Sequence, residues 1–186
     1  EPPAMPGDEY ADLVRAAAAH VVAAGRSVVA WQEAASAGLP RGSVLQWWDE
    51  RAPVDDAVAA VHAGARLLLS PASSVYLDMR YSADFPLGLD WAGTTELRDS
   101  HDWDPLAVVP GVGEDRIAGI EACLFSETLR TRDDLTTMLL PRLAAVAEAA
   151  WVGAGKRDWE DFASRVPALG RRWTARGLAW HRSPGV

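Results

Sequence analysis

Cysteine is almost absent from this 186-residue sequence, in which Cys123 stands alone. A single cysteine excludes an internal disulfide and a metal site built from several thiolates. Cys123 lies within the apolar run Ile117–Phe125, which predicts a buried, unreactive thiol rather than a nucleophile. The four histidines are scattered, with no two at helix or strand spacing, so we expect no metal site.

Positive charge and long apolar runs are also scarce. Lys and Arg number 18 against 26 Asp and Glu, and the net charge of −8 disfavours a nucleic-acid partner. No apolar run reaches the roughly 18 residues of a membrane-spanning helix, so no membrane association is expected. The start, Glu1-Pro2-Pro3, lacks the basic and apolar stretches of a signal peptide. The content of 49% hydrophobic and 24% charged residues indicates one globular domain or part of a larger one.

Hydrophobic periodicity predicts helices over residues 8–24, 55–63, 133–151 and 158–175. Pro141 kinks the third helix or opens its second segment at the first helical position, and the fourth is interrupted or bent near Pro167. Short apolar runs predict strands over residues 27–31, 43–48, 66–70 and 117–124. The long stretch over residues 71–115 is predicted to be irregular, and its many aromatic side chains favour a functional loop over disorder.

This order of elements favours a parallel sheet with crossover helices. Four such strands are half of an eight-stranded barrel, which typically needs about 250 residues. An open doubly wound sheet is the alternative, although no glycine-rich phosphate loop follows any predicted strand.

The strand ends combine aromatic and acidic side chains. Trp31 is followed by Glu33, and Trp48 by Asp49. Because a barrel places its function at the carboxyl ends of the strands, these tryptophans are predicted to face a ligand rather than the core. Aromatic faces beside carboxylates suit a sugar, whose C–H face stacks on a ring while its hydroxyls donate to oxygen. Four later tryptophans are predicted to be packing residues: Trp151, Trp159, Trp173 and Trp180.

Several ordered motifs carry a resemblance to a known family. The segment LLSPASSVYLDMRY (68–81) resembles a signature of glycoside hydrolase family 20, the β-N-acetylhexosaminidases. The motifs PLGLDWAG (86–93), HDWDP (101–105), GIEACLFSE (119–127), PRLAAVAEAAW (141–151) and RDW (157–159) follow in the family's order. The resemblance implies the C-terminal half of a (β/α)8 TIM barrel, strands five to eight, with C-terminal helices. Residues 1–186 would be a partial catalytic domain, with an active-site loop over about 71–115 and helices over about 133–176.

The resemblance also implies an activity, with no cofactor. Family members release terminal N-acetylglucosamine or N-acetylgalactosamine from glycans or chitooligosaccharides by retaining catalysis in which the substrate's own acetamide attacks the anomeric carbon. The general acid and its Asp neighbour lie in a His-x-Gly-x-Asp-Glu segment, which this sequence does not contain. The pair Asp49-Glu50 could be mistaken for part of it, and we interpret this pair as loop. The chain alone is therefore predicted to be inactive.

The alternatives to part of an active hydrolase are a non-catalytic sugar-binding half-barrel and a pseudoenzyme. A half-barrel leaves two open sheet edges, so the expected protein partner is the missing N-terminal half or a second copy of the chain.

Four aromatic residues are assigned to the sugar pocket by the resemblance. Trp31 and Trp48 would wall the cavity for the acetamide methyl group. Trp91 would line the mouth, or else simply anchor its loop. Phe125 stands where the family usually has a tryptophan beneath the sugar ring, which predicts weaker binding or an altered preference there.

Three polar residues complete the expected pocket. Tyr76 would donate its hydroxyl to the acetamide oxygen and hold it in line for attack. Asp78 and Glu127 would accept hydrogen bonds from the outer hydroxyls of the sugar. The alternatives are an ordinary buried tyrosine and two solvated loop carboxylates or helix caps.

Overall fold

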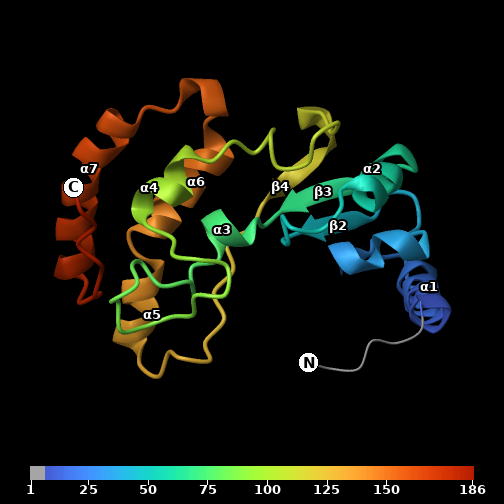
Figure 1. The fold of residues 1–186 in the computed structure, drawn as a ribbon, viewed down its shortest axis with the longest axis horizontal. Helices are drawn as coiled ribbons and strands as arrows, with labels where there is room; N and C mark the ends of the chain where they lie inside the picture. The colour runs from blue at the N-terminus through green and yellow to red at the C-terminus, as the bar shows by residue number, and fades with distance from the viewer. Residues whose placement is uncertain (1–6) are drawn as a thin grey trace. The chain divides into compact units, whose positions relative to one another are not determined.

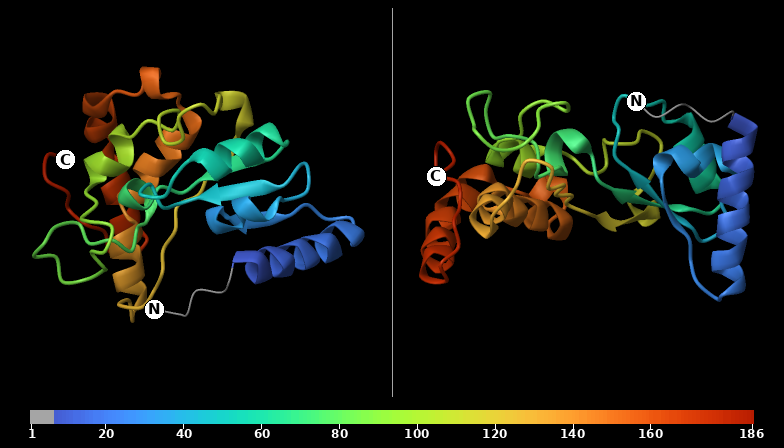
Figure 2. Two further views of the ribbon diagram at one scale, coloured as in Figure 1. Left: turned by 45° about the vertical axis from the view of Figure 1, so that its right-hand side comes forward. Right: turned by 90° about the horizontal axis from the view of Figure 1, so that it is seen from below.

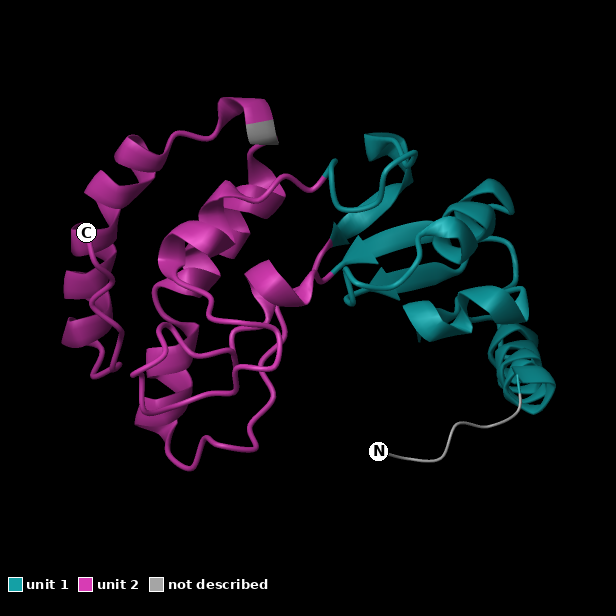
Figure 3. Ribbon diagram, viewed as in Figure 1, with its two compact units in different colours: residues 1–69, 106–119 teal, residues 70–105, 120–186 magenta. Residues whose placement is uncertain are grey.

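A computed structural model describes residues 7–186. The chain divides into two compact units (Figure 3). Unit 1 comprises residues 1–69 and 106–119, and unit 2 comprises residues 70–105 and 120–186. The predicted loop over residues 71–115 is therefore shared between the two units.

A parallel sheet forms the centre of unit 1. Its strands are β1 (Val29–Trp31), β2 (Val44–Trp47), β3 (Arg66–Leu69) and β4 (Ile117–Ile120), in the order β1-β2-β3-β4 (Figure 1). The β1–β2 and β2–β3 pairs are parallel, with Val29 opposite Val44 and Val44 opposite Arg66. Leu45, Leu67 and Leu69 are buried, as expected for strands covered by other elements. The predicted parallel order is confirmed for these three strands.

Helices of unit 1 are α1 (Gly7–Ala23), η1 (Gln32–Ala37), α2 (Asp55–His62) and η2 (Glu114–Arg116), where η marks a 3₁₀ helix. Both α1 and α2 contact η1 (Figure 2). The predicted helix over 8–24 is thus present, but Ala18 is its one buried residue, and Leu13 is 60% exposed. Much of the apolar face that the periodicity marks is therefore open to solvent.

Unit 2 is helical. Its elements are α3 (Ala72–Val75), α4 (Leu97–Asp102), α5 (Arg132–Leu139), α6 (Arg142–Trp151), η3 (Ala154–Lys156) and α7 (Trp159–Ala175). Helix α4 lies against α6 (Figures 1 and 2). Buried Leu97, Ala145, Phe162 and Val166 join α4, α6 and α7 in one apolar cluster.

The loop prediction was partly wrong, because residues 71–115 contain α3, α4 and η2. These helices are too short to show an apolar repeat in the sequence. Helix α4 is held instead by a capping box between Glu96 and Asp99.

Other boundaries also differ from the prediction. Strand β4 ends at Ile120 rather than at residue 124. Pro141 caps α6 instead of occupying its first turn, and α7 continues through Pro167 without interruption. Trp151 is 92% exposed, so its assignment as a packing residue was wrong, since the end of α6 projects its side chain outwards.

Candidate functional site

Unit 1 places two of the predicted aromatic residues at neighbouring strand ends. Trp31 ends β1 and is 40% exposed, while Trp48 follows the last residue of β2. The indole Nε1–H of Trp48 donates to Glu33 Oε1 at 2.8 Å. The Glu33 carboxylate, which follows β1, thereby orients the Trp48 indole, which follows β2.

Gln32 fixes the spacing of these two strand ends. Its buried side chain accepts from the backbone N–H groups of Trp48 and Asp49 at 2.7 and 2.8 Å. The same amide donates to the carbonyl oxygen of Asp49 at 3.1 Å. The sequence prediction missed this residue, although a polar side chain inside an apolar strand-to-helix junction was a usable signal.

The Asp49-Glu50 pair lies in the turn after β2, as predicted. Asp49 forms an ion pair with Arg51 at 2.7 Å. Its hydrogen bond from Arg51 lowers the pKa of the Asp49 carboxyl below its usual value. A general acid needs the opposite shift, so Asp49 is poorly suited to donate a proton near neutral pH.

Unit 2 gathers three of the predicted aromatic residues into a cluster. The Tyr76 ring lies 5.7 Å from the Trp91 ring, edge to face, and 5.5 Å from the Phe125 ring, measured between centroids. Tyr76 is buried, whereas Trp91 and Phe125 are each 43% exposed. The two outer rings therefore present an apolar surface to solvent above a buried tyrosine.

Backbone pairing sets the position of Tyr76 and Asp78. The N–H of Leu77 donates to the carbonyl of Cys123 at 2.7 Å, and the N–H of Cys123 donates to the carbonyl of Val75 at 3.0 Å. The carbonyl of Asp78 accepts from the N–H of Leu89 at 2.8 Å. The segment around Tyr76 is thus held on both sides by chain distant in sequence.

Asp78 is 1% exposed, and burial raises the pKa of its carboxyl, an effect that backbone N–H groups of Asp78 and Phe125 partly oppose. The negative charge of exposed Glu127 also raises this pKa. Among the residues that the structure describes, Asp78 Oδ1 has no hydrogen-bond partner. A buried carboxylate oxygen without a partner is costly, and such costs recur at binding sites.

Gly88 allows the neighbouring loop to approach Asp78. Its φ is +90°, and a Cβ atom there would lie 2.6 Å from the carbonyl oxygen of Asp78 and 2.6 Å from Met138 Cε. A side chain at this position would therefore displace the backbone of Asp78.

Cys123 is buried, and burial raises the pKa of its thiol to about 11. The prediction of an unreactive thiol agrees with this environment. In the described part of the chain, no group of His, Cys, Asp and Glu side chains is arranged to hold a metal ion. The described helices include none long and apolar enough to cross a membrane.

Comparison with known proteins finds one protein family and several solved structures that this chain resembles. The model of the glycosyl hydrolase family 20 catalytic domain matches residues 8–154. A β-N-acetylhexosaminidase from Cellulomonas fimi is 50% identical over 98% of this chain and 37% of its own length. The β-N-acetylhexosaminidase structure from Streptomyces coelicolor A3(2) superposes with a TM-score of 0.93 at 38% identity, over 98% of this chain and 38% of that one. A mutant Streptomyces plicatus β-hexosaminidase in complex with its product GlcNAc also gives a TM-score of 0.93 at 38% identity, over 98% and 37%.

These matches define an α/β fold of the TIM-barrel type. More particularly, the chain belongs to glycoside hydrolase family 20. It spans 37–38% of the length of the relatives compared above.

The raised pKa of Asp78 predicts a pH-dependent effect of the substitution Asp78→Asn. Because the folded-state pKa is raised, the folded chain favours the protonated carboxyl, and this contribution to stability is lost as the pH rises through that pKa. Removing the charge should therefore stabilise the fold at pH 7 by about 1 kcal/mol, or roughly 3 °C in Tm, and have less effect at pH 3.

Thermal unfolding at the two pH values measures this difference. Asp84→Asn, an exposed position in the same loop, is the control and should leave Tm unchanged at both. Destabilisation by Asp78→Asn at pH 7 would contradict the conclusion that burial makes the Asp78 carboxylate costly in the folded chain.

Proposed function

We propose that this chain is the C-terminal half, strands five to eight, of the catalytic barrel of an exo-acting β-N-acetylhexosaminidase. The family match and the similarity to several β-N-acetylhexosaminidases support this proposal. The observation that carries it is the buried Oδ1 atom of Asp78, which has no partner among the described residues. Asp78 follows closely after Tyr76 in the chain, and the Tyr76 ring packs against Trp91 and Phe125. A sugar offers a hydroxyl donor for the carboxylate and an apolar face for the rings.

In this proposal, Tyr76 donates its hydroxyl to the acetamide oxygen of a terminal N-acetylhexosamine. Asp78 and Glu127 accept from the outer hydroxyls of the sugar. Burial favours this use of Asp78, because a carboxylate with few water contacts gains more from each hydrogen bond that it accepts.

The aromatic residues bind the apolar parts of the substrate. Phe125 forms the floor beneath the sugar ring, and Trp91 lines the entrance; their exposed faces suit both roles. Trp31 and Trp48 contact the acetamide methyl group, and the bond from Trp48 to Glu33 supports a fixed orientation of that indole.

Catalysis follows the substrate-assisted, retaining course in this proposal. The acetamide oxygen attacks the anomeric carbon and forms an oxazolinium ion, while a general acid protonates the departing oxygen. Water then opens the oxazolinium ion. The general acid and its Asp neighbour come from outside this chain, since the sequence lacks the His-x-Gly-x-Asp-Glu segment.

The proposed protein partner is the N-terminal half of the barrel. In unit 1, β1 lies at an edge of the sheet, with Val29 61% exposed, and α1 exposes Leu13 and Val22. An open apolar edge strand is prone to pair with further chain. A second copy of this chain is the alternative occupant.

A non-catalytic sugar-binding protein is the second candidate function. The observation in its favour is that this sequence lacks the His-x-Gly-x-Asp-Glu segment. Binding without turnover by the complete gene product would identify this alternative.

The activity assay compares the complete gene product with residues 1–186 alone, using a nitrophenyl N-acetyl-β-glucosaminide. We expect turnover by the complete product and none by the chain alone, because the general acid and its Asp neighbour are missing from it. Turnover by residues 1–186 alone would contradict the proposal.

Tyr76 predicts an effect on the rate of the complete product. The substitution Tyr76→Phe should lower kcat about a hundredfold, because the acetamide is no longer held in its attacking position. An unchanged kcat would exclude this role of the Tyr76 hydroxyl.

Phe125 predicts a change in substrate affinity. In the complete product, Phe125→Trp should lower KM roughly threefold to tenfold, because the larger ring offers a stronger face to the sugar. Phe125→Leu, which removes the aromatic face, should raise KM. An unchanged KM in the tryptophan variant would exclude Phe125 as the floor of the sugar site.

A further inference from the structure

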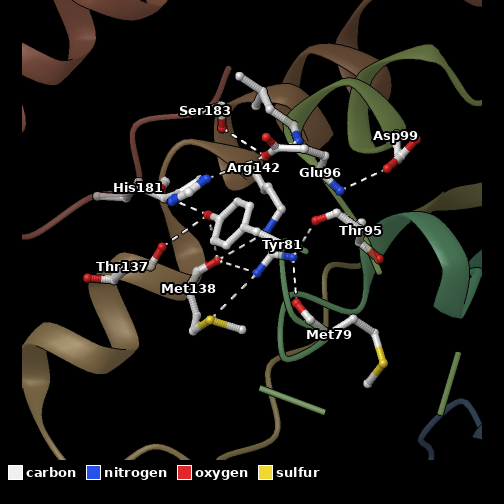
Figure 4. Close-up of polar contacts among 12 residues, drawn as sticks. Met79, Tyr81, Thr95, Glu96, Asp99, Thr137, Met138, Arg142, His181 and Ser183 are labelled. Atoms are coloured by element: carbon white, nitrogen blue, oxygen red, sulfur yellow. Dashed lines mark hydrogen bonds and ion pairs between the residues drawn. The ribbon is translucent and has the colours of Figure 1, made fainter. Parts of the chain in front are cut away.

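Arg142 is fully buried at the start of α6, where its guanidinium group is surrounded by backbone carbonyl oxygens (Figure 4). Nη1 donates to the carbonyls of Met79 at 2.7 Å and Thr95 at 2.8 Å. Nη2 donates to those of Leu77 at 2.7 Å and Met138 at 2.8 Å, and Nε donates to Met138 at 3.3 Å. All five N–H groups of the guanidinium therefore have a carbonyl acceptor.

Tyr81 covers one face of this cation (Figure 4). The centre of the guanidinium lies 3.8 Å from the centroid of the Tyr81 ring, in cation–π contact. The Tyr81 hydroxyl lies within hydrogen-bond distance of the carbonyls of Thr137 and Leu140, at 3.0 and 3.1 Å. Burial raises the pKa of Tyr81 to about 12, so the phenol stays neutral and keeps its proton for these acceptors.

The carbonyls that Arg142 binds include those on either side of Asp78. Leu77 and Met79 are its direct neighbours in the chain, so two strong hydrogen bonds fix the backbone before and after this carboxylate. The bond from Leu77 N–H to the carbonyl of Cys123 adds a third restraint. A short segment tied at three points holds the Cα–Cβ bond of Asp78 in one direction, and burial limits rotation of the carboxyl about that bond.

We propose that Arg142 is a positioning residue for the sugar site, acting through the backbone of Leu77 and Met79 to hold the Asp78 carboxylate in its binding orientation. The inference rests on the proposed function, and it assigns a role to a residue that does not itself touch the substrate. It requires arginine, because a lysine ammonium has three N–H groups and cannot donate to all four carbonyls that the five guanidinium N–H groups satisfy.

A double-mutant cycle on the complete gene product tests this proposal. The variants are Arg142→Lys, Asp78→Asn and the combination, with kcat/KM measured on a nitrophenyl N-acetyl-β-glucosaminide. If Arg142 acts through Asp78, Arg142→Lys should lower kcat/KM about tenfold in the wild-type background and less than twofold beside Asp78→Asn. The matched control is Arg171→Lys, at an exposed position on α7, which should leave kcat/KM unchanged.

A second variant covers the case in which Arg142→Lys does not fold. Tyr81→Leu leaves the cation in place and removes the ring stacked on it. Its loss of kcat/KM should therefore also be smaller beside Asp78→Asn than in the wild-type background. Thermal unfolding of each variant ensures that activity is compared among folded proteins.

The outcomes separate the two proposals. Equal fold losses in both backgrounds, from a wild-type enzyme that turns over substrate, would overturn the role of Arg142 and leave the proposed function standing. A wild-type complete product without turnover would overturn the proposed function, and this inference with it.

Discussion

The buried charge of Arg142 is the constraint on which unit 2 depends. Moving a guanidinium out of water costs many kcal/mol unless its donors are satisfied. Here the carbonyls of Leu77, Met79, Thr95 and Met138 supply the acceptors, and the Tyr81 ring covers one face. Because these carbonyls come from three separate stretches of chain, satisfying one cation joins three segments to α6: the segment around Asp78, the residue before the cap of α4, and the end of α5.

These ties explain how unit 2 keeps a buried acidic residue in place. Asp78 has a buried oxygen without a partner among the described residues, and burial raises its pKa. Gly88 brings the next loop within contact of the same backbone. A site of this kind costs stability in the free protein, and the cost is recovered when a ligand supplies the missing donor.

Apolar patterns in the sequence predicted the parallel strands, α1 and α2, and Pro141 indicated a kink or a new helical segment where α5 and α6 separate. The short helices α3 and α4 were missed, since neither spans enough turns to show a period, and α4 depends on the cap at Glu96. Motif resemblance selected Tyr76, Asp78, Trp91 and Phe125, and the structure brings the three aromatic rings together. Neither Gln32 nor Arg142 was identified. Their hydrogen-bond partners, the N–H of Trp48 for Gln32 and the carbonyl of Leu77 for Arg142, lie far along the chain, so the sequence could not show the bonds themselves.

We propose that the Asp78 segment, held in place by Arg142, binds an N-acetylhexosamine. A crystal structure of the complete gene product with N-acetylglucosamine would show the contacts of the bound sugar. We expect a sugar hydroxyl within hydrogen-bond distance of Asp78 Oδ1 and the sugar ring against Phe125. A sugar bound elsewhere, with Asp78 Oδ1 making no contact to it, would exclude Asp78 from the sugar site.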